Sequence, residues 1–129
     1  MSAKENKELI RKYLELASGK PKPLELLQKY TTDQALIDRA LASEIAFPLY
    51  RIDVDEMIAE GNLVSIRGRW KGMNAGPFMG HAPTGREVDV PVFVTYRVAG
   101  DKIIDHWMTF DTELLLQQLG ISQPERETL

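Results

Sequence analysis

The feature that most constrains the fold is a change of hydrophobic period near Tyr50. Before this residue, apolar residues recur at the spacing of an α-helix; after it, apolar and polar residues alternate as in a β-strand. A chain that begins with helical segments, continues as strands and ends with one short helical segment is typical of an α+β protein. We therefore expect a single domain over residues 1–129, with N-terminal helices packed on a curved, mostly antiparallel sheet.

Three helices are predicted in the N-terminal part. The first follows Ser2, which forms a capping box with the glutamate three residues later, and ends near Gly19. The second begins after Pro23, since proline is well suited to a helix start. The third begins after Asp33, a preferred N-cap residue, and ends before Pro48.

Four strands and a final helix are predicted after the change of period. The strands cover residues 50–61, 62–72, 86–98 and 102–110, with turns at Gly61-Asn62 and at Gly100. The last helix begins after Asp111 and ends at Gly120. Residues 121–129 are polar and are expected to fray.

The last two strands indicate which side chains share a face of the sheet. A regular hairpin pairs Tyr96 with Asp105 and places Trp107 on the same face, so that His106 points to the opposite face. Neither face then carries the polar row of a solvated surface. We expect helices to cover one face and either a second copy of the chain or a closed, curved sheet to cover the other, and we predict a homodimer through the sheet.

The composition excludes several classes of function. A net charge of −3 gives no electrostatic reason to expect nucleic acid or membrane as a partner. The absence of cysteine excludes disulfides, thiolate zinc sites and cysteine nucleophiles, and two distant histidines offer no metal site, so no metal or cofactor is expected. The charged N-terminus, "MSAKENKELIRKYL", is not a signal peptide, which favours a cytoplasmic protein. No phosphate-binding glycine motif and no G-x-S-x-G elbow occurs.

Three motifs in fixed order carry a family resemblance. They are "APTGREV" after a G-x-F-x-G, "GDKIIDHW", and a Trp-x-x-x-Asp that is followed by "LLLQQLG". With these motifs, the run from Ala46 to Gly120 resembles the SnoaL-like polyketide cyclases of the nuclear-transport-factor-2-like superfamily, which also includes ketosteroid isomerase. The resemblance implies a cone-shaped α+β barrel around a ligand cavity, and frequent dimers. For the characterised cyclases it implies a cofactor-free intramolecular aldol reaction with an aspartate as general acid/base.

The resemblance places that catalytic aspartate at Asp111, because the family's aspartate follows its tryptophan and Trp107 is the matching residue here. A carboxylate in this role takes a proton from a carbon next to a carbonyl and later returns it. The alternative interpretation is local: an aspartate immediately before a helix is a preferred N-cap, and "TEL" follows. Both interpretations stay open at this point.

The neighbouring strand residues are further candidates. His106 could donate a hydrogen bond to a developing enolate or tune the base, or it could lie at a sheet edge or a dimer interface. Trp107 is expected in the cavity wall. Tyr96 and Asp105 could form a hydrogen-bonded pair in the cavity, or equally at the interface.

The long segment Gly72–Val88 is predicted to be the bend between two strands of the curved sheet. Asn74 stands where the family commonly has the histidine of Thr-His-x-Gly; it could orient a substrate carbonyl or hold the loop backbone. Phe78 and Met79 are expected to turn toward the apolar interior, and His81 to lie at the pocket mouth or in solvent.

The sequence thus predicts a cofactor-free SnoaL-like enzyme, a polyketide (ester) cyclase. Its reaction would be intramolecular aldol-type carbon–carbon bond formation, or a related proton transfer, on a small hydrophobic carbonyl compound. Two alternatives share the fold: a non-catalytic dimer that binds a small hydrophobic ligand, and a dimeric interaction protein.

Overall fold

The computed structural model describes residues 2–121 and contains the helices and strands in the expected order. The elements are α1 (Ala3–Ala17), α2 (Leu24–Tyr30), α3 (Gln34–Ala46), β1 (Arg51–Glu60), β2 (Leu63–Met73), β3 (Glu87–Ala99), β4 (Lys102–Phe110) and α4 (Thr112–Leu119). The predicted α+β class is confirmed; the predicted fraying after residue 121 lies outside the described residues. None of the helices over residues 2–121 combines the length and the apolar character needed to cross a membrane.

Each helix begins at the residue whose chemistry predicts it. The Ser2 side chain accepts a hydrogen bond from the Glu5 amide, and the Glu5 carboxylate accepts one from the Ser2 amide, which completes the capping box of α1. Asp33 and Asp111 cap α3 and α4 as simple N-caps, by accepting hydrogen bonds from the amides of Leu36 and Leu114. Helix α4 ends at Gly120, whose φ of 70° lies in the left-handed region that glycine tolerates.

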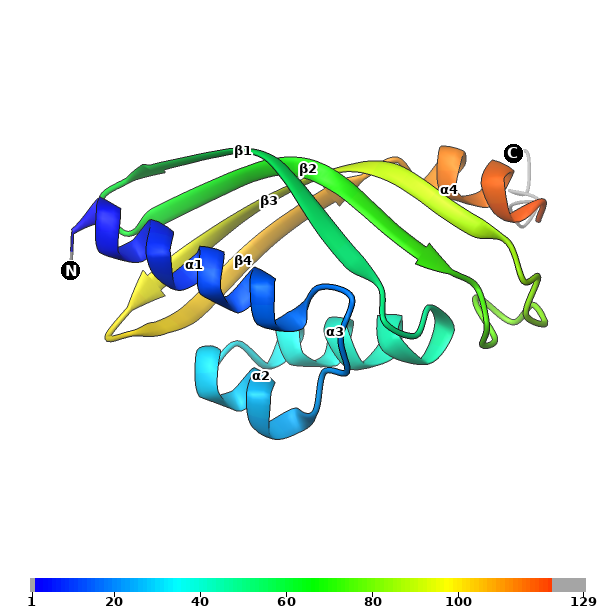
Figure 1. The fold of residues 1–129 in the computed structure, drawn as a ribbon, viewed down its shortest axis with the longest axis horizontal. Coiled ribbons are helices and arrows are strands. Elements are labelled where there is room, and N and C mark those ends of the chain that lie inside the picture. Colours follow the sequence, from blue (N-terminus) through cyan, green and yellow to red (C-terminus); the bar gives the residue numbers. More distant parts are fainter. Residues whose placement is uncertain (1, 122–129) are drawn as a thin grey trace, which may run out of the picture.

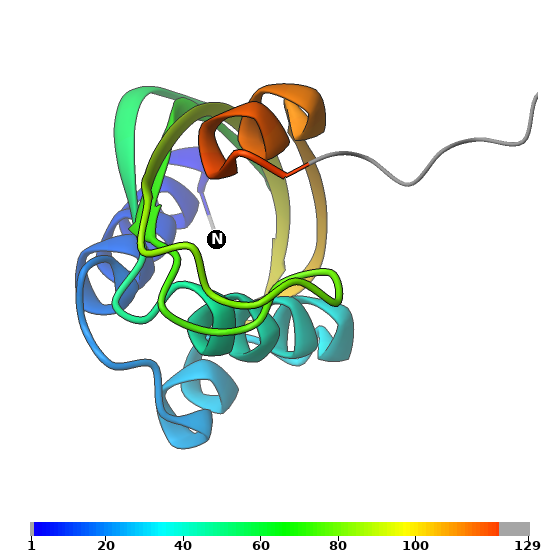
Figure 2. The same ribbon diagram turned by 90° about the vertical axis from the view of Figure 1, so that its right-hand side faces the viewer.

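The four strands form one antiparallel sheet in the order β1-β2-β3-β4, and the sheet is strongly bent. Figure 1 shows it arching over α1 and α3, and Figure 2 shows sheet and helices enclosing the interior in the view down the end of the cone. A bulge in β1 between Val54 and Glu56 contributes to the bend. At this place β1 and β2 approach closely, because a Cβ atom on Gly68 would lie only 2.2 Å from the carbonyl oxygen of Asp53.

The predicted register between β3 and β4 is wrong beyond the first pair after the turn. Val98 does lie opposite Ile103, but Tyr96 lies opposite His106 and not opposite Asp105. The cause is an extra residue in β4, because Ile104 has no partner on β3 and shifts the register by one. A one-residue shift turns every later side chain of the strand to the other face.

The core lies between the concave face of the sheet and the helices. Five side chains in it have no exposed surface, and they come from five different elements: Ile10, Leu27, Val64, Val92 and Ile103. Helix α4 packs on the end of β3, where Leu115 and Leu119 are buried near Val88 and Val90. The helices thus cover the concave face, and the convex face of the sheet is left to solvent in the single chain.

The long segment between β2 and β3 is the predicted bend, and it crosses the end of the cone (Figure 2). Within it, Phe78 and His81 exchange backbone hydrogen bonds of 3.0 and 2.9 Å around a tight turn. The two central residues of this turn, Met79 and Gly80, have positive φ angles of 49° and 77°. The segment is therefore an ordered loop at one end of the barrel.

Candidate active site

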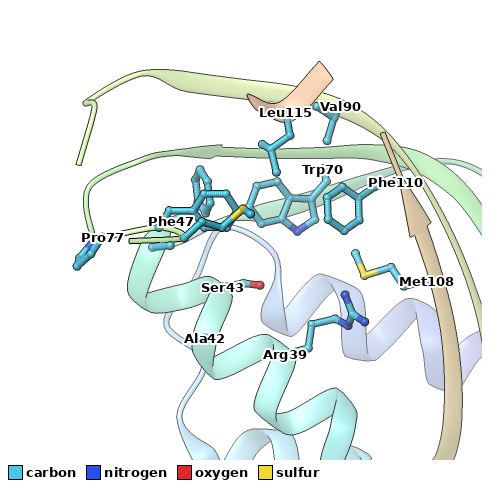
Figure 3. Close-up of a pocket in the computed structure, with 13 residues that line it drawn as sticks. Arg39, Ala42, Ser43, Phe47, Trp70, Pro77, Val90, Met108, Phe110 and Leu115 are labelled. Carbon is cyan, nitrogen blue, oxygen red and sulfur yellow. The ribbon is translucent and has the colours of Figure 1, made fainter. Parts of the chain in front are cut away.

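A cavity of about 370 Å³ lies between α3, the loop and α4 at the end of the cone. Figure 3 shows side chains from α3, the sheet and α4 around it. The lining is almost entirely apolar and consists of Arg39, Ala42, Ser43, Ala46, Phe47, Trp70, Pro77, Phe78, Met79, Val90, Met108, Phe110 and Leu115. Its size is at the lower end of the range for small-molecule sites.

Aromatic rings form the rigid part of this wall. The ring of Phe47 packs edge-on against Trp70 with centroids 4.9 Å apart, and against Phe78 at 5.4 Å. Trp70 in turn stacks on Tyr50, with ring centroids 5.0 Å apart. Because each ring is fixed by the next, the cavity is largely pre-formed for a flat or cyclic ligand.

Arg39 is the one charged residue among the described residues that line this cavity. It lies at the edge of the face of α3 that carries Leu36, Ala40 and Ser43, and it is itself exposed. In Figure 3 its guanidinium points from α3 toward Met108 on β4. A single positive charge therefore lies at the border of an otherwise apolar site.

A narrower pocket of about 40 Å³ continues toward the interior of the cone. It shares Arg39, Ser43, Trp70 and Met108 with the outer cavity, so the two spaces adjoin. Its own polar side chains are those of Tyr13, Ser18, Lys22, Tyr50, Tyr96 and His106. The site thus has an apolar outer part and a polar inner end.

The inner end holds a histidine–aspartate pair. The Nδ1 atom of His106 lies 2.6 Å from Oδ2 of Asp33, and the two side chains are only 5% and 10% exposed. The other oxygen of Asp33 accepts the hydrogen bond from the Leu36 amide, at 3.3 Å, that caps α3. One carboxylate therefore fixes both a helix start and the orientation of the imidazole.

The backbone around this pair is anchored as well. Thr31 forms a parallel bridge with Ile103 of β4, and its hydroxyl donates to the Ile103 carbonyl at 2.7 Å. The amide of Asp33 then donates to the Thr31 hydroxyl at 2.9 Å. The segment before α3 is thereby tied to β4, which holds the carboxylate and the imidazole at a fixed distance.

Burial changes the acid–base properties of the tyrosines at the inner end. It raises the pKa of Tyr13 to about 12, and it raises the pKa values of Tyr50 and Tyr96 as well. Their hydroxyl groups therefore stay protonated at neutral pH. Each is available as a neutral hydrogen-bond donor in the pocket.

Lys22 supports this region from below. Its ammonium group donates to Glu44 at 2.8 Å and to the Tyr50 carbonyl at 2.9 Å, and it lies 4.0 Å from the centroid of the Tyr50 ring. Burial lowers the pKa of Lys22, while the hydrogen bond and charge of Glu44 act in the opposite direction. These contacts fix the ring of Tyr50, which stacks on Trp70.

Among residues 2–121, no group of three histidine, aspartate or glutamate side chains could hold a metal ion.

Comparison with known proteins agrees with this geometry. The family model of the SnoaL-like polyketide cyclases matches residues 22–119. This chain belongs to the SnoaL-like polyketide cyclase family. The predicted family resemblance is thus confirmed. No curated protein matches the sequence.

Solved structures share the fold of this SnoaL-like chain. AclR from Streptomyces galilaeus, a proposed hydroxylase, is 22% identical with a TM-score of 0.80, and the match covers 98% of this chain and 87% of AclR. A proposed SnoaL-like polyketide cyclase from Jannaschia sp. CCS1 is 19% identical with a TM-score of 0.81, over 94% of this chain and 95% of that one. IdmH from Streptomyces antibioticus, a proposed polyketide cyclase, is 21% identical with a TM-score of 0.75, and the match covers 91% of this chain and 99% of IdmH. At these identities the likeness establishes the fold.

The expectation that Trp107 lies in the cavity wall is wrong. The extra residue in β4 turns Trp107 to the convex face, where it is 50% exposed. There the guanidinium of Arg97 lies over the Trp107 ring, 5.2 Å from the ring centroid. The same shift turns His106 inward and separates Asp105 from Tyr96. Tyr96 does line the inner pocket, with His106 in place of the expected partner.

Asp111 caps α4, as its local interpretation predicts. Its Oδ1 atom accepts a hydrogen bond of 2.9 Å from the Leu114 amide, and the residue is exposed. It is absent from the residues that line either pocket. The structure therefore places the residue matched to the family's aspartate at a helix start, away from the histidine–aspartate pair.

Asn74 is buried inside the loop, with 1% of its surface exposed. Its amide nitrogen donates to the carbonyls of Ala46 and Gly76, at 3.1 and 2.8 Å, and its side-chain oxygen accepts from the Thr84 amide at 2.8 Å. All three contacts are with backbone groups, so Asn74 holds the loop rather than a ligand. Of the two interpretations from the sequence, the structural one describes its contacts.

The remaining loop residues lie at the mouth of the cavity. Phe78 is half-buried and Met79 is 55% exposed, and both line the cavity as expected. His81 is exposed and lines neither pocket. The loop thus contributes apolar contact to the site but no titratable group.

Two residues of the site were not singled out as such from the sequence. Asp33 was identified only as a helix cap, and Arg39 was not considered. Arg39 is exposed at the edge of the buried face of α3, where a charged residue is ordinary, so the sequence offers no signal for it. The pairing of Asp33 with His106 spans 73 positions and depends on tertiary contact, for which the sequence has no local signal.

Proposed function

We propose that this SnoaL-like chain is a cofactor-free enzyme that moves a proton next to a carbonyl group of a small hydrophobic compound. The reaction is either an intramolecular aldol-type carbon–carbon bond formation or a simpler isomerisation. The compound's apolar body occupies the outer cavity, and its reacting carbonyl reaches the polar inner end. The proposal is supported by the family and by a buried histidine–aspartate pair at the end of an apolar cavity.

His106 is the proposed general acid/base. In the proposed mechanism Asp33 accepts a hydrogen bond from Nδ1 of His106, and Nε2 of the neutral imidazole is the base. Nε2 takes a proton from the carbon next to the substrate carbonyl, and the electron pair of that bond moves to the carbonyl oxygen to give an enolate. The enolate carbon then attacks a second carbonyl. The new carbon–carbon bond leaves an alkoxide, which recovers the proton from His106.

The tyrosines of the inner pocket are the proposed donors to the developing oxyanion. The pKa values of Tyr13, Tyr50 and Tyr96 are raised by burial, so each hydroxyl keeps its proton and can donate without ionising. Fixed donors of this kind stabilise the enolate more than the neutral ketone, which lowers the barrier to its formation.

The single observation that carries the proposal is the distance of 2.6 Å between His106 and Asp33, both almost fully buried. Asp111, the acid/base expected from the family, caps a helix and is exposed. An imidazole held by a buried carboxylate meets the requirements of the proton transfer better than an exposed carboxylate that already accepts a backbone hydrogen bond.

Deuterium exchange tests the proposal directly. The α-protons of 2-tetralone, a small bicyclic ketone, are followed by NMR in D₂O with and without the protein. We expect wild-type protein to accelerate the exchange and His106→Gln to reduce this acceleration about 100-fold or more. The chain's other histidine provides a matched control, because His81→Gln alters only an exposed loop residue. Asp111→Asn keeps a good N-cap and should leave the exchange rate unchanged.

Two results would contradict the proposal. If Asp111→Asn abolishes exchange while His106→Gln retains it, the acid/base is the aspartate expected from the family. If wild-type protein binds ketones without accelerating exchange, the chain is a non-catalytic binding protein on the same fold.

We also propose a homodimer through the convex face of the sheet. This face exposes four large apolar side chains, Ile58, Phe93, Ile104 and Trp107, which are between 41% and 65% exposed in the single chain. Ile58 of β1 lies opposite Ser65 of β2, and Trp107 of β4 lies opposite Thr95 of β3, where the Ser65 and Thr95 hydroxyls share a hydrogen bond of 2.7 Å. An exposed apolar group of this kind is typical of a protein–protein interface.

A further inference from the structure

We propose that the ligand of the cavity is a small aromatic acid, whose ring lies between the aromatic side chains and whose carboxylate binds Arg39. This inference names the substrate class of the proposed active site and therefore depends on the ligand occupying that cavity. It does not depend on which residue moves the proton. Three properties of the cavity support it: its charge, its shape and its size.

The charge of the cavity selects an anionic ligand. Over residues 2–121, every ion pair of the structure joins other residues, and no carboxylate lies within 4.0 Å of the Arg39 guanidinium. Arg39 is an exposed residue, so its guanidinium lies at the solvent side of the cavity, beside apolar groups such as Met108. A carboxylate matches both its charge and the planar fork of donors that arginine presents. A cationic ligand would meet no negative side chain among the described residues that line the cavity.

The shape of the cavity selects a ring. Phe47, Trp70, Phe78 and Phe110 contribute aromatic surface from the C-cap of α3, β2, the loop and β4. Figure 3 shows the labelled rings of Phe47, Trp70 and Phe110 along one side of the space and Arg39 on the opposite side. A flat ligand can therefore pack on the rings while a polar substituent reaches toward α3.

The size of the cavity limits the ligand. A volume of about 370 Å³ accommodates about 12–18 non-hydrogen atoms, if each takes roughly 20–30 Å³ with its hydrogens, close to the share of a water molecule in the liquid. This number corresponds to one or two fused rings with a carboxylate and a carbonyl substituent. A compound with four fused rings exceeds it.

The position of Arg39 connects this ligand with the proposed chemistry. Arg39 and Ser43 line both the outer cavity and the inner pocket, so a carboxylate bound there lies at the boundary between them. The opposite side of the same boundary is formed by Met108, two residues from His106 on the inward face of β4. Arg39 is therefore a positioning residue that directs one end of the ligand toward the inner pocket.

Equilibrium binding of two probes tests the inference. 2-Naphthoate and its neutral amide, 2-naphthamide, have the same ring and the same number of non-hydrogen atoms, and neither carries an exchangeable α-proton. Calorimetry at neutral pH should show tighter binding of 2-naphthoate than of the amide to wild-type protein. Arg39→Gln should lower the affinity for 2-naphthoate about tenfold to a hundredfold, and it should change the affinity for the amide less than about twofold. Arg67→Gln on the convex face, where Arg67 is paired with Glu56, should change neither affinity.

Three outcomes would overturn the inference: wild-type protein binds the amide as tightly as the acid, Arg39→Gln weakens both probes equally, or 2-naphthoate does not bind wild-type protein at millimolar concentration. The ratio of the two affinities in wild-type protein tests the charge preference without any variant. Because no turnover is measured, a negative exchange assay with 2-tetralone would leave the carboxylate site standing. Conversely, if the protein catalyses proton exchange but does not bind 2-naphthoate, only this inference is contradicted and the proposed function is not.

Discussion

Replacing Asn74 by alanine tests whether this residue holds the loop. The substitution removes three side-chain hydrogen bonds, to the carbonyls of Ala46 and Gly76 and from the amide of Thr84. A typical hydrogen bond contributes a net of about 1 kcal/mol, and partners that stay buried without a replacement cost more. We therefore expect the free energy of unfolding to fall by about 3 kcal/mol.

Urea unfolding at equilibrium, followed by tryptophan fluorescence, measures this loss. With a slope of about 1.5 kcal/mol per M urea, the midpoint should fall by about 2 M at an unchanged slope. Asn62→Ala provides the matched control, because Asn62 is an exposed turn residue whose carbonyl, not its side chain, accepts the hydrogen bond from Val98. We expect this control to shift stability by less than about 0.5 kcal/mol.

The reasoning is refuted if Asn74→Ala loses less than about 1 kcal/mol, since that is the contribution of only one of its hydrogen bonds. It is also refuted if the variant keeps its stability and loses affinity for ligands. The second result would favour the other interpretation from the sequence, that Asn74 orients a substrate carbonyl.

Two further predictions concern the buried tyrosines and the convex face. The pKa of Tyr13 is raised to about 12 by burial, so its contribution to stability is complete below pH 10 and is lost as the pH rises through 12; at pH 11 the loss is about 1.4 kcal/mol. Urea unfolding at pH 8 and pH 11 should show a smaller loss in Tyr13→Phe than in wild-type protein, and an equal loss would show that Tyr13 ionises normally. Phe93→Glu places a charge in the proposed dimer interface and should convert the dimer to a monomer in sedimentation experiments. Ile45→Glu, at an exposed apolar residue on α3, should leave the dimer intact. A wild-type protein that sediments as a monomer would contradict the proposed dimer.

The helices and turns of this fold could be predicted because their signals are local. A capping box needs only Ser2 and Glu5, and an N-cap needs only one side chain such as Asp33 and the amide three residues later. The change of period near residue 50 similarly records which side chains meet the core over a few neighbouring positions. Element type, order and class therefore followed from the sequence.

The site could not be predicted, because one residue without a local signal decides it. Ile104 looks like any strand residue, yet it has no partner on β3 and shifts the register. With a regular hairpin Trp107 faces the cavity, whereas with the bulge His106 faces it. Two expectations that depended on the alternation along β4 beyond Ile103 failed together: Trp107 in the cavity wall and the pairing of Tyr96 with Asp105.

The double role of Asp33 explains why a helix cap can also be part of an active site. A carboxylate has two oxygens, and a cap needs only one, so the second is free to bind His106 across the cone. The cap fixes the carboxylate relative to α3, the Thr31 bridge fixes the same segment relative to β4, and the imidazole is thereby oriented by elements from both sides of the cavity. The bulge at Ile104 is necessary for this arrangement, because only the shifted register directs the histidine to the carboxylate. The same local irregularity that defeats prediction from the sequence thus assembles the proposed acid/base.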